Sequence, residues 1–115
     1  MIDEIEQSIK NSAEIIKESA TFAKEIEEIV LTIVNAFKNN NKVILFGNGG
    51  SAADAQHIAA EFIGRFKLER ESYPAIALTT DTSIITALSN DYSNDIIFSR
   101  QCESLVSNGD IVIGI

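Results

Sequence analysis

The chain is short of the residues on which several kinds of protein depend. Its 115 residues include one cysteine, one histidine, one proline and no tryptophan. A single cysteine, Cys102, excludes an internal disulfide and suits a reducing compartment. No basic amino-terminal segment leads into an apolar stretch, and no apolar run approaches the roughly 20 residues that a membrane helix needs. We therefore expect a cytoplasmic protein.

Positive charge is also scarce. Nine Lys and Arg residues stand against 17 Asp and Glu residues, which gives a formal net charge of -8 at pH 7. So much negative charge argues against non-specific binding to nucleic acid or to anionic membranes as the main role. A protein of this charge that binds an anion needs local positive potential, which helix N-termini, backbone N–H groups or a metal ion can supply.

What the chain does contain is a periodic pattern of apolar residues sufficient for one domain at most. Apolar stripes of helical period predict helices over about 3–19 and 22–37, and three asparagines at 39–41 end the second. Beyond them, strands at 42–46, 75–78 and 111–115 alternate with helices at 51–66, 82–88 and 96–106. This alternation predicts right-handed crossovers and a parallel sheet covered by helices on both faces.

A glycine-rich turn, Gly47-Asn48-Gly49-Gly50-Ser51, joins the first predicted strand to a helix. Its backbone N–H groups and the helix N-terminus can together bind an anion or another polar ligand. The alternative is a purely structural turn, with Ser51 as N-cap and Asp54 three residues later as in a capping box. The spacing matches neither a dinucleotide-binding fingerprint nor a Walker A loop.

His57 and Glu61 stand four residues apart on the predicted helix, and therefore on one face. They are candidates for a metal site or an acid/base pair, at roughly 9 and 15 Å along the helix axis from Ser51. The alternative is a surface pair or a histidine that packs against its neighbours. Two ligands do not complete a tetrahedral site, and the chain has no second histidine.

Several segments together resemble the sugar isomerase (SIS) domain family, and within it the phosphoheptose isomerase branch. They are Gly47-Asn48-Gly49-Gly50-Ser51, His57-Ile58-Ala59-Ala60-Glu61-Phe62, Arg65-Phe66, Pro74-Ala75-Ile76-Ala77-Leu78, Asn90-Asp91 and Gly109-Asp110. The resemblance implies an α/β fold, a SIS-type doubly wound parallel sheet flanked by helices and preceded by N-terminal helices. It divides the chain into an N-terminal helical region for oligomer packing, residues 1–41, and the N-terminal portion of a sugar-phosphate-binding domain, residues 42–115.

The resemblance also implies an activity and a site. The reaction is the conversion of sedoheptulose 7-phosphate to D-glycero-D-manno-heptose 7-phosphate through a metal-assisted enediolate, by a homotetramer with one zinc ion per subunit. The product would supply heptose for bacterial lipopolysaccharide. In this numbering the metal ligands are His57 and Glu61, and Glu61 is also the catalytic acid/base. The substrate-binding residues implied are Asn48, Gly49, Gly50, Ser51, Glu61, Asn90 and Asp91.

The resemblance exposes one departure. In the family, the segment that matches residues 109–115 leads into a phosphate-binding loop, and a later helix carries a glutamine and a histidine that complete the metal site. We therefore expect that this chain is an N-terminal fragment of a longer enzyme and that it is inactive by itself.

Two other functions compete with the enzyme. One is a non-catalytic adaptor resembling the bacterial replication-initiator-associating protein, and the other is a sugar-phosphate-sensing domain of a regulator. The pair His57 and Glu61 favours the enzyme, because an adaptor has no need of the carboxylate. Some residues also have purely structural alternatives: Asn90-Asp91 as a turn and Arg65 as a cation at a helix C-terminus.

Overall fold

A computed structural model describes residues 1–115 and divides them into two compact units, residues 1–32 and residues 33–115. The boundary falls inside helix α2 (Ala23–Lys38). The functional division expected at residue 41 stays a prediction. None of the helices combines the length and the apolar character required to span a bilayer.

The first unit consists of helix α1 (Ile2–Glu18), a short 3₁₀ helix η1 (Ser19–Phe22) and the beginning of α2. Both predicted amino-terminal helices are thus confirmed. No residue of α1 is buried, although the helix carries five large isoleucines. The exposed isoleucines of α1 are Ile2, Ile5, Ile9, Ile15 and Ile16.

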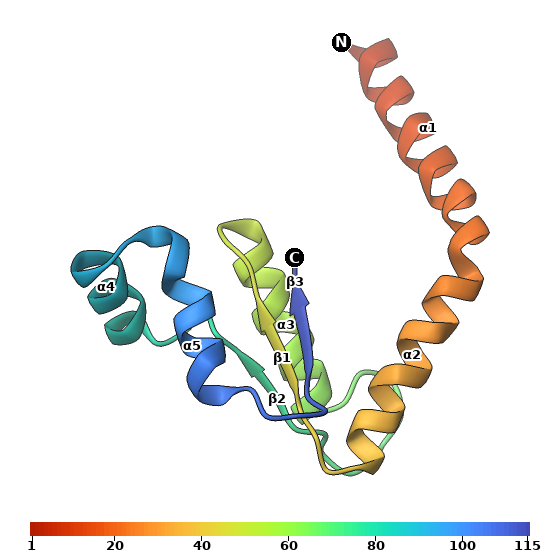
Figure 1. Ribbon diagram of the computed structural model, residues 1–115. Coiled ribbons are helices and arrows are strands. Elements are labelled where there is room, and N and C mark those ends of the chain that lie inside the picture. The colour runs from red at the N-terminus through yellow and green to blue at the C-terminus, as the bar shows by residue number, and fades with distance from the viewer. The chain divides into compact units, whose positions relative to one another are not determined.

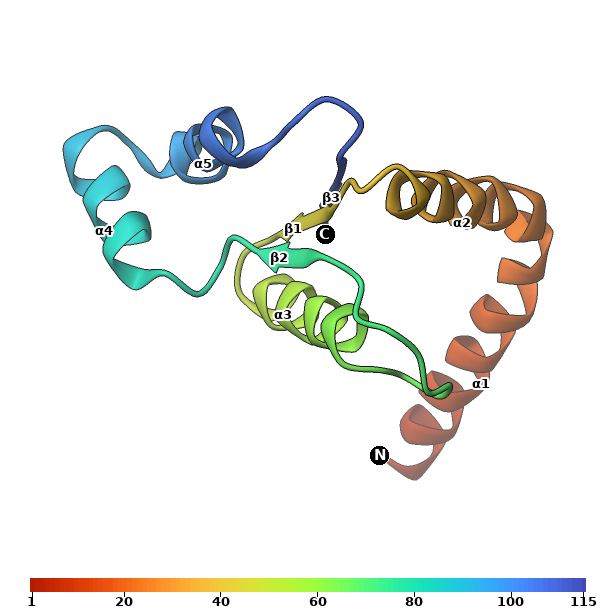
Figure 2. The ribbon, with the colours of Figure 1, turned by 90° about the horizontal axis from the view of Figure 1, so that it is seen from below.

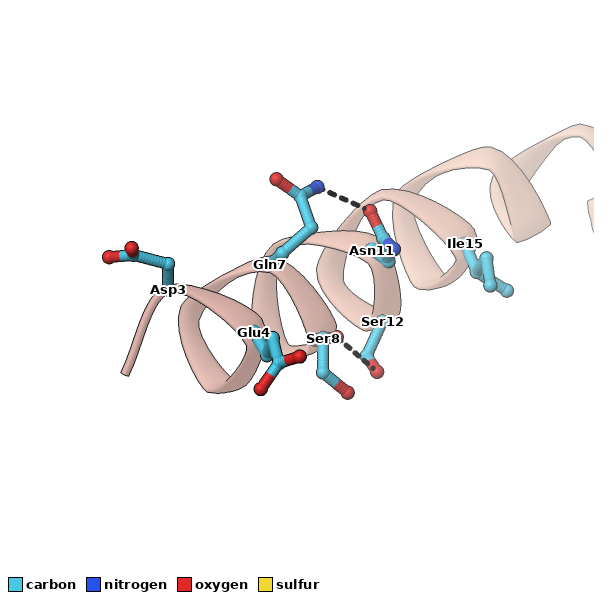
Figure 3. A pocket seen from close by; sticks show the side chains of 7 residues that line it. All are labelled: Asp3, Glu4, Gln7, Ser8, Asn11, Ser12 and Ile15. Carbon is cyan, nitrogen blue, oxygen red and sulfur yellow. Dashed lines mark hydrogen bonds between the residues drawn. The ribbon is translucent and has the colours of Figure 1, made fainter. Parts of the chain in front are cut away.

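One stretch of α1 carries mainly polar side chains (Figure 3). Within it, Gln7 donates a hydrogen bond to Asn11 Oδ1 at 2.7 Å, and Ser12 donates to the carbonyl oxygen of Ser8 at 3.0 Å. Both bonds join successive turns of the same helix. This stretch is therefore a solvated helix surface, and no side chain from another element converges on it.

Helix α2 ends where the asparagines predict. Asn40 adopts the left-handed conformation with φ of 60°, which asparagine tolerates better than most residues. The N–H of Asn41 then donates to the carbonyl oxygen of Ala36 at 3.0 Å, so a carbonyl group of the last helical turn gains a partner.

The second unit is built on a parallel sheet of three strands, β1 (Val43–Phe46), β2 (Ala75–Ala77) and β3 (Ile111–Gly114), in the order β2-β1-β3. Helix α3 (Gly50–Ile63) connects β1 to β2. Helix α4 (Thr82–Asp91), the 3₁₀ helix η2 (Asn94–Ile96) and helix α5 (Ile97–Leu105) connect β2 to β3. The two crossovers run to opposite edges of the sheet, and α3 and α5 lie on its opposite faces (Figures 1 and 2). The predicted parallel sheet is confirmed.

The first three residues of the central strand β1, Val43 to Leu45, are fully buried, as expected for a parallel sheet covered on both faces. Val43 and Leu45 pack against the small residues Ala55 and Ala59 of α3. On the other face, the ring of Phe46 stacks on Phe98 of α5 with centroids 4.9 Å apart. The alternation of side chains along β1 thus joins both helical layers to one strand.

Some element boundaries differ from the prediction. Helix α3 ends at Ile63 rather than near residue 66, because the chain leaves the helix at Gly64, the C-cap. Helix α4 continues past the expected end to Asp91, starting from Asp81, whose carboxylate accepts a hydrogen bond from the N–H of Ile84 at 3.0 Å. Asn90 and Asp91 therefore lie in the last turn of a helix and not in the turn after it.

Candidate functional site

The glycine turn lies at the switch point of the sheet, where the connections lead from the central strand β1 first to one edge and later to the other. It follows β1, whose crossover leads to the β2 edge, and it stands beside the end of β3 at the other edge. The N–H of Ile115 donates to the carbonyl oxygen of Phe46 at 3.0 Å, so the ends of β1 and β3 are adjacent. In open α/β sheets, ligands bind outside the carboxyl ends of strands at such a switch point.

Gly49, and not Ser51, is the N-cap of α3. Its φ of 57° and ψ of -122° are a backbone conformation that glycine adopts without strain. Ser51 lies inside the helix, and no side chain accepts a hydrogen bond at the cap, so the capping box with Asp54 is wrong. Asn48, Gly49 and Gly50 are exposed. The start of α3 is consequently open to a polar ligand.

Gly47 is required for a different reason, which is close packing. A Cβ atom at this position would lie 2.6 Å from Ser51 Cβ and 3.0 Å from the carbonyl oxygen of Ile115. We expect Gly47→Ala to lower the free energy of unfolding by about 1–3 kcal/mol, the usual cost of overpacking. Urea unfolding followed by circular dichroism measures this change.

Gly50→Ala is the matched control for Gly47→Ala, because a Cβ at Gly50 would meet no atom within 4 Å. This variant should keep or slightly increase stability, since alanine is a better helix former than glycine. Equal stability of the two variants would contradict the packing described at Gly47.

Helix α3 brings His57 and Glu61 together. His57 Nε2 lies 3.6 Å from Glu61 Oε1, and the side chains are 75% and 33% exposed. Two zinc ligands at about 2.0–2.2 Å from the ion and at a tetrahedral angle are roughly 3.4 Å apart. The pair therefore fits two positions of such a site. No set of three His, Cys, Asp or Glu side chains in this chain is close enough to hold a metal ion, so further ligands would come from outside these residues.

An open hollow of about 420 Å³ adjoins His57. Its walls are mostly apolar, and His57 and Asp54 are the polar residues that line it. Asp54, His57 and Glu61 follow one another at spacings of three and four residues, so they share a helix face. The same spacing is present in the sequence, but there the capping box is the only role predicted for Asp54.

The pair Asn90-Asp91 stands apart from the glycine turn. Asn90 Nδ2 donates to Asp91 Oδ1 at 3.1 Å, and both residues are exposed at the end of α4. No hydrogen bond joins them to α3, and Figures 1 and 2 show α4 apart from α3. Their role in binding substrate stays a prediction.

Comparison with known families decides the assignment of the fold. The SIS domain family model matches residues 6–115, nearly the whole chain. The chain belongs to the SIS domain family.

Several relatives of this SIS domain are phosphoheptose isomerases. The chain is 54% identical to the phosphoheptose isomerase of Aquifex aeolicus and 52% identical to that of Citrifermentans bemidjiense, in both cases over its whole length. A solved phosphoheptose isomerase from Francisella tularensis is similar at a TM-score of 0.92, with 33% identity over 98% of the chain. The chain spans 61% and 60% of the first two relatives and 60% of that structure.

The SIS domain also contains two contacts beside the site that the sequence did not reveal. Thr79, just after β2, accepts a hydrogen bond from Gln56 Nε2 at 3.1 Å and so ties the sheet edge to α3. Arg70 binds several carbonyl oxygens around the end of α3. Neither contact has a local sequence signal, because each depends on how the loops return to the helix.

Proposed function

We propose that the full-length protein is a phosphoheptose isomerase that converts sedoheptulose 7-phosphate to D-glycero-D-manno-heptose 7-phosphate. The observation that supports this most is the placement of His57 and Glu61, 3.6 Å apart, on a helix that begins at an exposed glycine turn. Sequence identities above 50% to phosphoheptose isomerases support the same reaction.

Different parts of α3 would bind different parts of the substrate. Asn48, Gly49, Gly50 and Ser51 offer N–H groups and polar side chains to hydroxyl or phosphate oxygens of the substrate at the helix N-terminus. The reacting carbons then lie about two to three turns further on, beside Glu61. Asn90 and Asp91 would bind other hydroxyl groups.

Glu61 is the residue of this chain that can move the proton. Its carboxylate takes a proton from the carbon next to the carbonyl, and the electron pair forms the double bond of an enediolate. The carboxyl group, whose proton exchanges with water, then delivers a proton to the neighbouring carbon while the hydroxyl proton passes from O1 to O2, which converts ketose to aldose without any net change in redox state.

His57 and Glu61 would also hold a zinc ion, one per subunit, with ligands from outside these residues. Such an ion, when bound, supplies electrophilic stabilisation of the charge that develops on oxygen. Imidazole and carboxylate groups are both common ligands of zinc.

Replacement of His57 by glutamine tests this donor set. We expect the zinc content of purified His57→Gln to fall and its zinc affinity to weaken at least tenfold, because a direct ligand is lost. Elemental analysis and competition with a chelator measure both quantities. Glu69→Gln, which alters an exposed carboxylate in a surface pair with Arg65, is the control and should bind zinc normally. Unchanged zinc binding in His57→Gln would exclude His57 as a ligand.

We propose that the full-length protein forms a homotetramer through its N-terminal helices. Within the first unit, Phe22, Ile26, Ile29, Val30 and Leu31 of η1 and α2 are all more than half exposed, an apolar surface that association would bury. We expect Ile26→Asp to convert the tetramer into smaller species in analytical ultracentrifugation. Lys24→Asp, a change at a charged position of the same helix, should leave the tetramer intact. A tetramer that survives Ile26→Asp would place the interface elsewhere.

A turnover assay separates the enzyme from the adaptor and the sensor. ³¹P and ¹H NMR should show sedoheptulose 7-phosphate converted to a heptose 7-phosphate by the full-length protein. A folded protein that binds the sugar phosphate without converting it would favour the sensor. One that does neither would favour the adaptor.

A further inference from the structure

Arg70 makes a dense set of contacts at the carboxyl end of α3. Its guanidinium group donates to the carbonyl oxygens of Glu61 at 2.7 Å and Phe62 at 2.9 Å. It also donates to the carbonyl oxygens of Gly64 at 3.3 Å and Glu71 at 2.8 Å. One half-buried side chain thus binds the helix and the loop that follows it.

The bond to Glu61 satisfies a carbonyl group that the helix leaves without a partner, whereas the carbonyl group of Phe62 also accepts a hydrogen bond from the N–H of Tyr73 at 3.0 Å. The last four carbonyl groups of any α-helix lack an intrahelical donor. Many helices solve this with a glycine in the left-handed conformation, but Gly64 has a φ of -83°. Here the cation performs the task, and its charge also complements the negative end of the helix dipole.

An aromatic cluster holds Arg70 in place. The guanidinium carbon lies 4.4 Å from the centroid of the Tyr73 ring, which stacks on Phe37 with centroids 4.6 Å apart. Phe37 in turn meets the edge of Phe62 at 5.4 Å. The fork of the guanidinium is therefore fixed both by its acceptors and by packing.

We propose that Arg70 is a positioning residue for Glu61. Glu61 stands two residues before the end of α3, where helices fray, and Arg70 binds the backbone of Glu61 itself. Fixing this last turn sets the distance between the carboxylate and His57, which lies about one turn further from the end. The proposal rests on the proposed isomerase function.

The test compares Arg70→Ala and Arg70→Lys with the wild type in the full-length protein. Arg70→Ala should lower kcat about 10- to 100-fold with KM changed less than threefold, since small misplacements of a reacting group have effects of this size. Arg70→Lys keeps the charge but not the fork. It should recover the melting temperature lost in Arg70→Ala while kcat stays low. Added guanidinium ion at millimolar concentration should raise the kcat of Arg70→Ala.

Arg100→Ala is the matched control, because Arg100 also lies over a tyrosine ring and pairs with a neighbour, but on α5. Its kcat should equal that of the wild type. A wild-type kcat in Arg70→Ala, or full recovery of kcat in Arg70→Lys, would overturn the proposal. An inactive wild type would instead refute the isomerase function. Hydrogen exchange of residues 61–64 then decides on Arg70 alone: faster exchange in Arg70→Ala supports its hold on this turn, and unchanged exchange overturns it.

Discussion

Replacement of Glu61 by glutamine is expected to lower kcat for sedoheptulose 7-phosphate by about 10²–10⁴-fold in the full-length protein, the range usual for loss of a general acid/base. The amide has the shape of the carboxylate but cannot accept the proton from carbon. The side chain is one-third exposed and its carboxylate makes no hydrogen bond with the protein, so the fold should not change. An NMR assay of turnover gives the effect directly.

Two measurements make the Glu61→Gln result interpretable. The oligomer mass, and the melting temperature of the zinc-free protein, should match those of the wild type, because no buried contact is removed. Glu103→Gln, which alters an exposed carboxylate paired with Arg100, should keep full activity. Near-wild-type turnover in Glu61→Gln would remove Glu61 from the mechanism and with it the reason to prefer an enzyme over a sugar-phosphate sensor.

Replacement of Asp110 by asparagine should have the largest effect on stability, about 2–4 kcal/mol of the free energy of unfolding. The side chain of Asp110 is only 2% exposed. It accepts hydrogen bonds from the backbone N–H of Lys42 at 3.0 Å, the Lys42 ammonium group, the N–H of Ser107 at 2.7 Å and the Asn41 amide at 3.2 Å. An asparagine would leave several of these donors without an acceptor. Urea unfolding measures the loss, and Asp95→Asn, at an exposed position, should change stability by less than about 0.5 kcal/mol.

The same carboxylate predicts a pH dependence. Burial by itself raises the pKa of Asp110, but hydrogen bonds from Lys42, Ser107 and Asn41 outweigh it and hold the pKa well below its ordinary value. In the unfolded chain the pKa is about 3.9. The stabilisation is therefore complete above about pH 4 and is lost as the pH falls below it, because the unfolded chain binds the proton first. The stability difference between wild type and Asp110→Asn should shrink below pH 4, and a difference that is constant down to pH 2 would contradict this linkage.

Much of the fold was predictable because its signals are local. Apolar periodicity identified the helices, and the asparagines after α2 marked its end through the left-handed preference of Asn40. The position of β1 between two helical layers followed from the alternation of strands and helices along the chain. The ends of α3 and α4 were less predictable, because Gly64 and the continuation to Asp91 depend on how the following loops pack.

The candidate site was predictable only in part. The spacing of His57 and Glu61 fixes them on one helix face, and the structure places their side-chain atoms within 3.6 Å. The sequence suggested Ser51 as the cap of α3, whereas Gly49 takes that position, because its left-handed φ ends the turn without a side-chain acceptor. The donors around Asp110 lie up to 69 positions away in the sequence, and the acceptors of Arg70 depend on the return of a loop, so no local pattern reveals such pairs.

The central claim is that Glu61 moves a proton between adjacent carbons of a phosphorylated seven-carbon sugar. The most direct measurement is conversion of sedoheptulose 7-phosphate by the full-length protein in deuterium oxide, with the product analysed by NMR. The account predicts deuterium at C2 of the aldose in the wild type, and no detectable product in Glu61→Gln over the same time. Product formed by Glu61→Gln at the wild-type rate would contradict it.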